Sequence, residues 1–255
     1  MTVKDQARMT RKQKRALQQQ GRSNEEFVHA ANPPKTTYKL KSVEPLTNNQ
    51  RLTFEAYESG KNLLLHGIAG TGKSFLSIYL SLTSVLAESS RYKKLVIVRS
   101  VVPTRDMGFL PGNNKEKAKV YEAPYQAIFT ELFGRGDAYE ALKTKGLVDF
   151  ISTSFIRGLT INDSIIVVDE IANCTLHELD SVITRVGKNC KIIFSGDFRQ
   201  SDFTKEHERN GLTDFMRIIN RMKSFEFIDF DENDIVRSAM VKEYIIAKDR
   251  LKIVS

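Results

Sequence analysis

The stretch Gly67-Ile68-Ala69-Gly70-Thr71-Gly72-Lys73-Ser74 decides the fold, because it fits the pattern G-x4-G-K-[ST] without a gap. A short apolar segment (62–66) precedes it and an amphipathic segment (74–88) follows it. A glycine-rich turn between a strand and a helix aims backbone N–H groups at phosphate, and the helix dipole adds to the attraction. The pattern predicts a nucleotide-binding loop from Gly67 to Phe75, in which Lys73 reaches the β- and γ-phosphates and Ser74 ligates magnesium.

Two adjacent carboxylates, Asp169 and Glu170, end the continuous apolar run 165–168. Paired acids at the end of a buried strand are costly without a cation. We therefore expect Asp169 to hold Mg²⁺ through its water shell and Glu170 to act as the general base toward water. The alternative is an ordinary acidic turn.

A third polar group follows the apolar run 192–194, where Ser195-Gly196-Asp197 leads to Gln200. The G-D-x-x-Q spacing places the neutral amide of Gln200 where it can sense the γ-phosphate, with Asp197 anchoring the loop. A polar turn without a catalytic role is the alternative.

Two residues outside these groups are further candidates. Gln50 lies ahead of the first strand and could read the adenine edge by paired hydrogen bonds, which would select ATP over GTP. Arg237 is expected in the first turn of a helix over 233–248, where a positive charge opposes the helix dipole. Such a placement indicates contact with a phosphate, and an exposed surface arginine is the alternative.

From about residue 42, apolar runs alternate with amphipathic segments, which is typical of a parallel sheet covered by helices on both faces. Ligands of such sheets bind at the carboxyl ends of the strands, where all of these polar groups fall. The expected strands are 62–66, 95–99, 148–153, 164–170, 191–197 and 225–230. The expected helices are 74–88, 121–133, 176–186, 211–223 and 233–248.

Two segments depart from this alternation. Residues 1–41 carry ten Lys or Arg and three Asp or Glu, so most of the formal net charge of +8 lies there. We expect a basic, flexible N-terminal tail that either binds phosphate backbones or only aids solubility. The segment 102–119, with four Gly or Pro, is expected to be an irregular loop that touches either single-stranded nucleic acid or a neighbouring subunit.

Composition limits the class of protein. A hydrophobic fraction of 41% suits a folded domain, and no apolar run approaches the roughly 18 residues that cross a bilayer. The two cysteines, Cys174 and Cys190, lack a partner at metal-ligand spacing. We expect a cytoplasmic protein with no membrane association.

These residues together resemble the PhoH-like family of P-loop ATPases, which is similar to one half of a superfamily 1 helicase. The resemblance spans roughly 42–250 and includes Gly108-Phe-Leu-Pro-Gly112, Pro124-Tyr125, Arg157-Gly158 and Asp234-Ile-Val-Arg237. Two positions depart from the family pattern: Arg99 is followed by Ser100 instead of proline, and Asp169-Glu170 by Ile171-Ala172 instead of Ala-Gln.

The resemblance implies a three-layer, RecA-like α/β domain over 42–255 with a mostly parallel sheet, which binds ATP and Mg²⁺. A single RecA-like domain would need a neighbouring subunit to complete its site, so a homo-oligomeric, hexameric ring is expected. Arg237, Arg157 and Arg185 are the candidates for an arginine finger from the next subunit.

Three functions remain open. The first is an ATP-driven enzyme that remodels or unwinds RNA or single-stranded DNA. The second is an ATP-binding regulatory or assembly module of the phosphate-starvation type, with slow hydrolysis and no helicase activity. The third is a small-molecule kinase, which the G-D-x-x-Q pattern and the lack of an arginine-rich lid disfavour.

Overall fold

The computed structural model describes residues 38–101, 114–197 and 206–251, with backbone alone for 114–119 and 206–210. All helices and strands described below lie in one compact unit, Leu40–Ser255. No helix in these ranges is both long and apolar enough to cross a membrane.

Six parallel strands form one sheet in the order β3-β2-β4-β5-β1-β6. Their bounds are β1 Asn62–Gly67, β2 Lys94–Arg99, β3 Val148–Ser152, β4 Ser164–Asp169, β5 Lys191–Gly196 and β6 Phe225–Phe230. β1 lies between β5 and β6, so the strand before the phosphate loop is flanked by strands far away in sequence. The predicted parallel α/β fold is confirmed.

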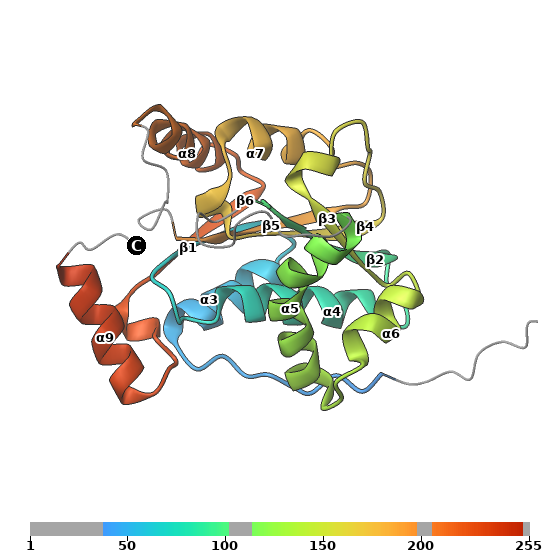
Figure 1. Cartoon of the computed structure of the whole chain (residues 1–255), viewed down its shortest axis with the longest axis horizontal. Helices are drawn as coiled ribbons and strands as arrows, with labels where there is room; N and C mark the ends of the chain where they lie inside the picture. Colours follow the sequence, from blue (N-terminus) through green and yellow to red (C-terminus); the bar gives the residue numbers. More distant parts are fainter. Residues whose placement is uncertain (1–37, 102–113, 198–205, 252–255) are drawn as a thin grey trace, which may run out of the picture. The chain divides into compact units, whose positions relative to one another are not determined.

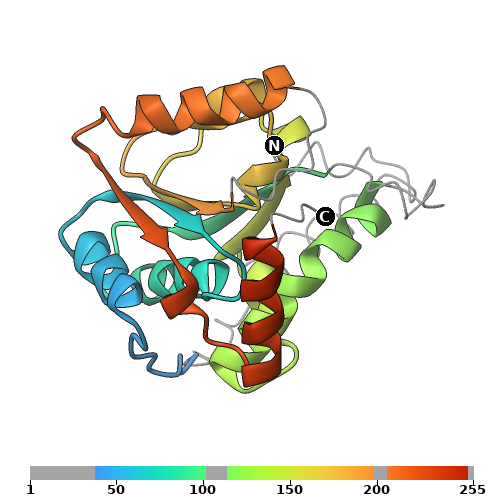
Figure 2. The same cartoon turned by 90° about the vertical axis from the view of Figure 1, so that its left-hand side faces the viewer.

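Helices cover both faces of the sheet, which gives three layers (Figures 1 and 2). On one face lie α3 Asn48–Glu58, α4 Lys73–Val85, α5 Asn114–Phe133 and α6 Ala138–Thr144. On the other lie α7 Leu176–Ile183 and α8 Glu206–Ile219, and α9 Ala239–Arg250 follows the last strand. Short 3₁₀ turns fill in the connections at η2 Thr153–Phe155, η3 Ile171–Asn173 and η5 Glu232–Asp234.

The four inner strands, β2, β4, β5 and β1, are buried on both faces, as parallel strands between helices require. The edge strands β3 and β6 are only partly buried. One hydrophobic cluster joins alternate strand residues to α7 and α8 through Val168, Phe194, Leu179 and Phe215. The intervening strand residues, such as Leu65 and Val167, are fully buried and point to the α4 face.

Two helices were not expected from the sequence. In α3 the buried positions are Gln50, Thr53 and Tyr57, which share one face but are mostly polar, so hydrophobic periodicity does not reveal them. Helix α6 has only seven residues, too few for a periodic pattern.

Three helix starts differ from expectation. Helix α5 begins at Asn114, so the loop expected over 102–119 is wrong for its last six residues. The glycines and prolines of that segment all precede residue 114, and Lys, Glu and Ala then favour helix. Helix α8 begins at Glu206, earlier than expected, and α9 at Ala239, later than expected.

Candidate active site

The phosphate loop joins β1 to α4 and bends through three glycines with positive φ, namely Gly67, Gly70 and Gly72. A Cβ atom at Gly67 would lie 2.0 Å from the carbonyl oxygen of Phe230 on β6. Glycine is therefore required at position 67 by the close approach of the neighbouring strand as well as by its φ. Gly72, in the left-handed conformation, precedes the first residue of α4.

Lys73 lies buried inside the curve of this loop. Its ammonium donates to the carbonyl oxygens of Gly67 at 2.8 Å and Ile68 at 2.7 Å, and to Thr71 Oγ1 at 3.1 Å. The charge that is expected to meet phosphate is thus held at the loop by the loop's own oxygen atoms.

The acidic pair lies next to the phosphate loop. Ser74 Oγ donates to Asp169 Oδ1 at 2.7 Å, so a hydroxyl from α4 and a carboxylate from β4 meet. Glu170 follows in the left-handed region (φ 54°, ψ 45°), which is uncommon for a residue other than glycine. This backbone turns the chain from β4 into η3 and leaves Glu170 exposed at the site.

The end of β5 packs tightly against this turn. A Cβ at Gly196 would lie 2.9 Å from the backbone nitrogen of Ile171, so glycine permits the contact. Ser195 and Asp197 are buried beside the site. Gln200 lies outside the described residues.

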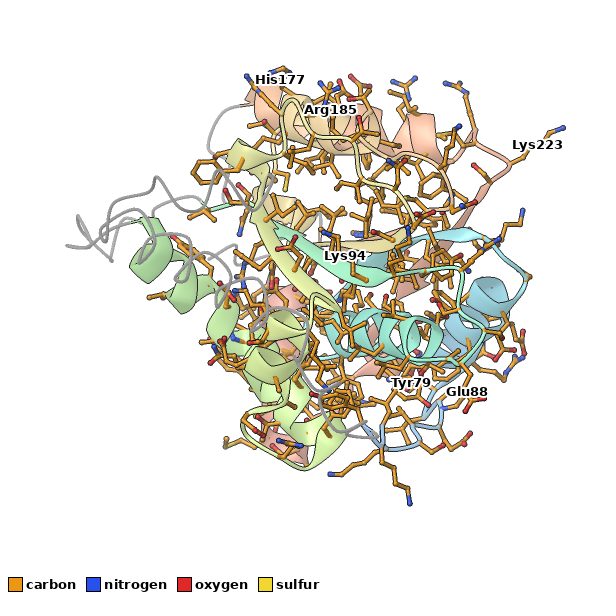
Figure 3. All side chains as sticks on the ribbon, turned by 90° about the vertical axis from the view of Figure 1, so that its right-hand side faces the viewer. Tyr79, Glu88, Lys94, His177, Arg185 and Lys223 are labelled. Atoms are coloured by element: carbon orange, nitrogen blue, oxygen red, sulfur yellow. The ribbon has the colours of Figure 1, made fainter. Side chains whose placement is uncertain are left out.

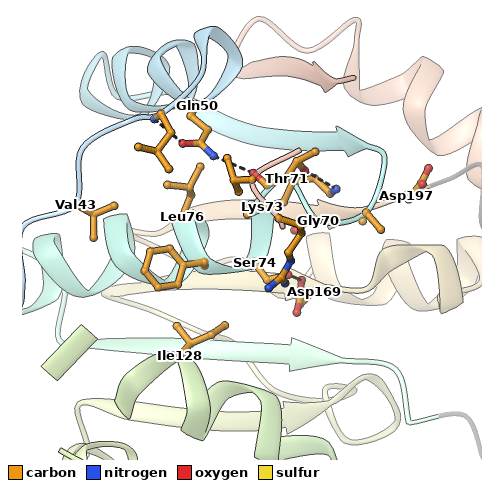
Figure 4. Close-up of a pocket in the computed structure, with 18 of the residues that line it drawn as sticks. Val43, Gln50, Gly70, Thr71, Lys73, Ser74, Leu76, Ile128, Asp169 and Asp197 are labelled. Atoms are coloured by element: carbon orange, nitrogen blue, oxygen red, sulfur yellow. Dashed lines mark hydrogen bonds between the residues drawn. The ribbon is translucent and has the colours of Figure 1, made fainter. Parts of the chain in front are cut away.

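A cavity of about 540 Å³ connects these groups. One end is polar, with Lys73, Ser74, Asp169 and Glu170; Figure 4 shows Val43, Leu76 and Ile128 on its other side. A cavity of this size with a polar and an apolar end suits a nucleotide, whose phosphates and base differ in polarity.

Gln50 lies at this cavity, buried on α3. Its Nε2 donates to the carbonyl oxygen of Thr71 at 3.0 Å and its Oε1 accepts from the Leu46 N–H at 2.8 Å. Each of these atoms retains one hydrogen-bonding position, because an amide offers two donors and two acceptor lone pairs. In the structure, therefore, Gln50 links the phosphate loop to the segment before α3.

Buried Asp234 fastens α3 to the turn after β6. Its Oδ1 accepts from Thr47 Oγ1 at 2.5 Å, and its Oδ2 accepts from Asn49 Nδ2 at 2.7 Å. Just beyond, the Val236 N–H donates to the carbonyl oxygen of Gly70 at 3.0 Å. The phosphate loop is thus held from both sides by segments far apart in sequence.

Arg237 lines the cavity of its own chain, with its Cγ 3.1 Å from the position of a Cβ on Gly70. The expectation that it lies in the first turn of the last helix is wrong. Asp231 caps the 3₁₀ turn over Glu232–Asp234, Ile235 is extended, and α9 begins only after Ser238. The argument from an opposed helix dipole therefore does not apply.

The other two arginines lie away from the cavity lining. Arg157 is exposed in the connection after β3. The Arg185 carbonyl accepts from the Ile161 N–H, ahead of β4 and β5, at the amino ends of the strands. Figure 3 shows Arg185 on the α7 side of the sheet, across from Tyr79 on α4.

Sequence reasoning assigned no role to two residues that meet the acidic pair, Tyr125 and Arg99. The Tyr125 hydroxyl donates to Asp169 Oδ2 at 3.0 Å. Arg99 ends β2 directly opposite Asp169 in the strand register. The sequence held a signal for Arg99, because it is a charged residue at the end of an apolar strand. For Tyr125 the only signal was its place in the family resemblance.

A phosphate loop after β1 of a parallel sheet, with an acid pair at the end of β4, one strand further along the sheet than β5, defines a P-loop NTPase. The chain belongs to the PhoH-like protein family, whose sequence pattern matches residues 42–248. The expectation from the sequence is confirmed in this respect.

Several relatives show the extent of the similarity. The PhoH-like protein of Bacillus subtilis (strain 168) is 30% identical over 215 residues, which cover 83% of this chain and 66% of that protein. Protein PhoH2 of the same organism is 37% identical over 142 residues, covering 54% of this chain and 32% of that protein. Protein PhoH of Escherichia coli (strain K12) is 26% identical over 195 residues, covering 76% and 54%. The chain spans less than two thirds of the length of these relatives.

Among solved structures, the Pif1 helicase from Candida albicans is similar over 84% of this chain and 46% of that chain, with 17% identity and a TM-score of 0.40. The Pyrococcus furiosus Hef helicase domain is similar over 72% and 38%, with 15% identity and a TM-score of 0.43.

Proposed function

We propose that this protein binds ATP with magnesium and hydrolyses it, and that hydrolysis is coupled to the binding or unwinding of RNA or single-stranded DNA. One observation carries the proposal: Lys73, Ser74, Asp169 and Glu170, from distant parts of the chain, line a single cavity of about 540 Å³. A lysine, a hydroxyl and two acids around a phosphate loop are the groups that phosphoryl transfer to water needs.

The donor set fits magnesium. Ser74 Oγ and Asp169 Oδ1 lie 2.7 Å apart, and both are the hard oxygen donors that Mg²⁺ prefers. Among the described residues no group of three or more His, Cys, Asp or Glu could hold a metal ion. That suits Mg²⁺ in such enzymes, because it keeps waters and takes further oxygens from the phosphates. The bound ion would neutralise charge on the transferred phosphoryl group.

The chain's own residues would divide the remaining work. Backbone N–H groups of the phosphate loop and Lys73 bind and orient the phosphates. Glu170, exposed at the cavity, accepts a proton from the attacking water. Arg237 lies against Gly70 of the same chain, which supports the proposal that it contacts phosphate in cis. Gln50 remains the proposed reader of adenine through its unused amide positions.

Coupling to nucleic acid rests on charge and on exposed aromatic surface. The segment 1–41 is strongly basic, although it lies almost wholly outside the described residues, as does the loop over 102–113. Phe155, with 64% of its surface exposed, is two residues from exposed Arg157. An exposed ring near a guanidinium group suits base stacking with charge attraction.

A hexameric ring is also part of the proposal. Arg157 and Arg185 line no part of the cavity in their own chain, and they remain the proposed candidates for a trans finger that reaches the site of a neighbouring subunit. Assembly would then be needed for full turnover.

The test is ATP hydrolysis measured with and without single-stranded RNA and single-stranded DNA. Stimulation by either polymer supports coupling. Slow turnover that neither polymer changes would favour the regulatory module, and phosphate transfer to a metabolite would favour a kinase. Failure to bind labelled ATP in Mg²⁺ would overturn the proposal.

Lys73→Ala is the matched negative control. The substitution removes the ammonium that three loop oxygens hold at the phosphate site. We expect turnover to fall by about 10²–10³-fold, the size of losing one preorganised charge-stabilising donor. Turnover is measured as released phosphate with malachite green. Turnover near that of the parent protein would contradict the proposed role of Lys73.

A further inference from the structure

Asp169, the proposed magnesium-holding carboxylate, receives a hydrogen bond on each oxygen. Ser74 donates to Oδ1 at 2.7 Å, and the Tyr125 hydroxyl on α5 donates to Oδ2 at 3.0 Å. Asp169 is 4% exposed and Tyr125 is fully buried. Two donors on separate oxygens fix the plane of the carboxylate, which a single donor would leave free to rotate.

The direction of the Tyr125 hydrogen bond is set by its surroundings. A carboxylate oxygen can only accept, so the Tyr125 hydroxyl donates its proton to the bond with Asp169 Oδ2. Arg99 lies at the end of β2, directly opposite Asp169 in the strand register. Because a guanidinium group can only donate, Arg99 cannot take the proton of the Tyr125 hydroxyl away from Asp169.

Arg99 strengthens this arrangement by its charge. The negative charges of Asp169 and Glu170 attract the Arg99 guanidinium group. The positive charge at the end of β2 therefore lies close to the phenol and to both acids.

We propose that Tyr125 is a positioning residue, whose hydroxyl holds Asp169 in the orientation that supports Mg²⁺ beside the phosphate loop. The inference rests on the proposed function. Ser74 is itself a proposed ligand of the ion, so its bond to Asp169 is the one that metal binding would replace. Tyr125 then supplies the bond that keeps the carboxylate in place. Partners of this kind typically contribute about 10–100-fold to metal affinity or activity.

The test compares Tyr125→Phe with Tyr139→Phe. Both tyrosines are buried and donate to a carboxylate, since the Tyr139 hydroxyl donates to Glu122 Oε2 at 2.7 Å. Glu122 lies on α5 outside the cavity lining, so Tyr139→Phe is a control for the general loss of a buried hydroxyl. In each variant the aromatic ring remains to fill its site.

The probe is a fluorescent ADP analogue, bound first in EDTA and then titrated with Mg²⁺. For Tyr125→Phe we expect affinity in EDTA within two-fold of the parent protein, and a half-saturating Mg²⁺ concentration raised by about ten-fold. Tyr139→Phe should lower the unfolding temperature while leaving the Mg²⁺ titration unchanged. An unshifted titration for Tyr125→Phe, with or without lost stability, would overturn the proposal.

A double-mutant cycle with Asp169→Asn separates positioning from any independent effect. If Tyr125 acts through Asp169, the Mg²⁺ shift of the double variant equals that of Asp169→Asn alone. Additive shifts would sink the inference. A parent protein that binds the analogue no better in Mg²⁺ than in EDTA would instead refute the magnesium part of the proposed function.

Discussion

At the residue scale, the left-handed backbone of Glu170 is an unusual feature of the site. Positive φ at a residue with a side chain costs of order 1 kcal/mol and persists only where neighbouring packing imposes it. Here the tight contact between Gly196 and Ile171 fixes the turn that follows. The strain therefore coincides with the residue proposed to activate water.

Glu170→Gln tests that role. The amide keeps the shape of the side chain but cannot take a proton, so we expect nucleotide affinity within about three-fold of the parent and hydrolysis lower by about 10²–10⁴-fold. Equilibrium binding and steady-state phosphate release measure the two quantities. Glu226→Gln, at an exposed carboxylate on β6, is the control and should hydrolyse normally. Full activity in Glu170→Gln would remove this residue from the mechanism.

The sequence pattern predicted those parts of the site whose residues lie close together in the chain. The loop around Lys73 and the acids at the end of β4 are each contained in a few consecutive residues, and the structure brings them together. Tyr125 escaped notice because its contact with Asp169 spans 44 residues and depends on how α5 crosses the strand ends. The predicted position of Arg237 was wrong because Asp231 caps a 3₁₀ turn ahead of α9, so the helix begins later in the chain. Hydrophobic periodicity does not reveal such a cap.

At the element scale, the approach of β6 to the end of β1 constrains the phosphate loop. Gly67→Ala places a Cβ against the Phe230 carbonyl, which is backbone and cannot rotate away. Gly146→Ala is the matched control, because Gly146 also has positive φ (71°) but no atom lies within 4 Å of its added Cβ. We expect Gly146→Ala to lower the free energy of unfolding by about 1 kcal/mol and Gly67→Ala by about 2–3 kcal/mol more. Equal losses in urea titrations would argue against the steric explanation.

A second element-scale feature is Glu178, which closes the capping box of α7. It accepts from Thr153 Oγ1 at 2.5 Å, Thr175 N at 2.8 Å and Ser100 Oγ at 3.2 Å. Burial raises the pKa of Glu178, but these hydrogen bonds outweigh burial and bring the pKa below its usual 4.5. One carboxylate thus ties the ends of β2 and β3 to the start of α7.

The lowered pKa of Glu178 determines how the stability of the fold depends on pH. A depressed pKa in the folded state means that the stabilisation is present above about pH 4.5 and is lost as the pH falls through the lower folded-state value. Glu178→Gln should therefore lower the free energy of unfolding by about 1 kcal/mol at pH 7. The difference in unfolding free energy between the parent protein and the variant should become smaller toward pH 3. Urea unfolding at both pH values checks this, and a gap that stays constant would contradict it.

The sheet was predictable element by element, and two helices were not. Continuous apolar runs such as 165–168 identify buried parallel strands without ambiguity when polar residues bound them. Helix α3 was not predicted because its buried positions are not hydrophobic. The buried side chains of Gln50 and Thr53 donate to the backbone carbonyl oxygens of Thr71 and Asn49.

At the scale of the whole molecule, charge is concentrated in one segment. The basic excess within residues 1–41 suits phosphate backbones, and salt weakens such contacts in proportion to their number. Deleting residues 1–35 should lower affinity for single-stranded RNA and flatten its salt dependence, while nucleotide binding stays unchanged. Fluorescence anisotropy at several salt concentrations measures both, and unchanged affinity would assign the tail to solubility.

Assembly is the second property at this scale. If a neighbouring subunit completes the site, the protein should elute near six times its monomer mass in ATP with Mg²⁺, and specific activity should rise with protein concentration. Light scattering coupled to size exclusion gives the mass. Full, concentration-independent activity in a monomer would contradict the ring.

The strand order has a consequence for how the protein is made. β1 pairs with β5 on one side and with β6 on the other. Asn62 of β1 pairs with Phe225 of β6, so most of the domain's sequence lies between these two partners. While a ribosome is still translating the chain, the strand that leads into the phosphate loop has an open edge until β6 emerges. The turn carrying Val236, whose N–H donates to Gly70, emerges later still, so a nascent chain should become competent to bind nucleotide only once this turn has left the ribosome.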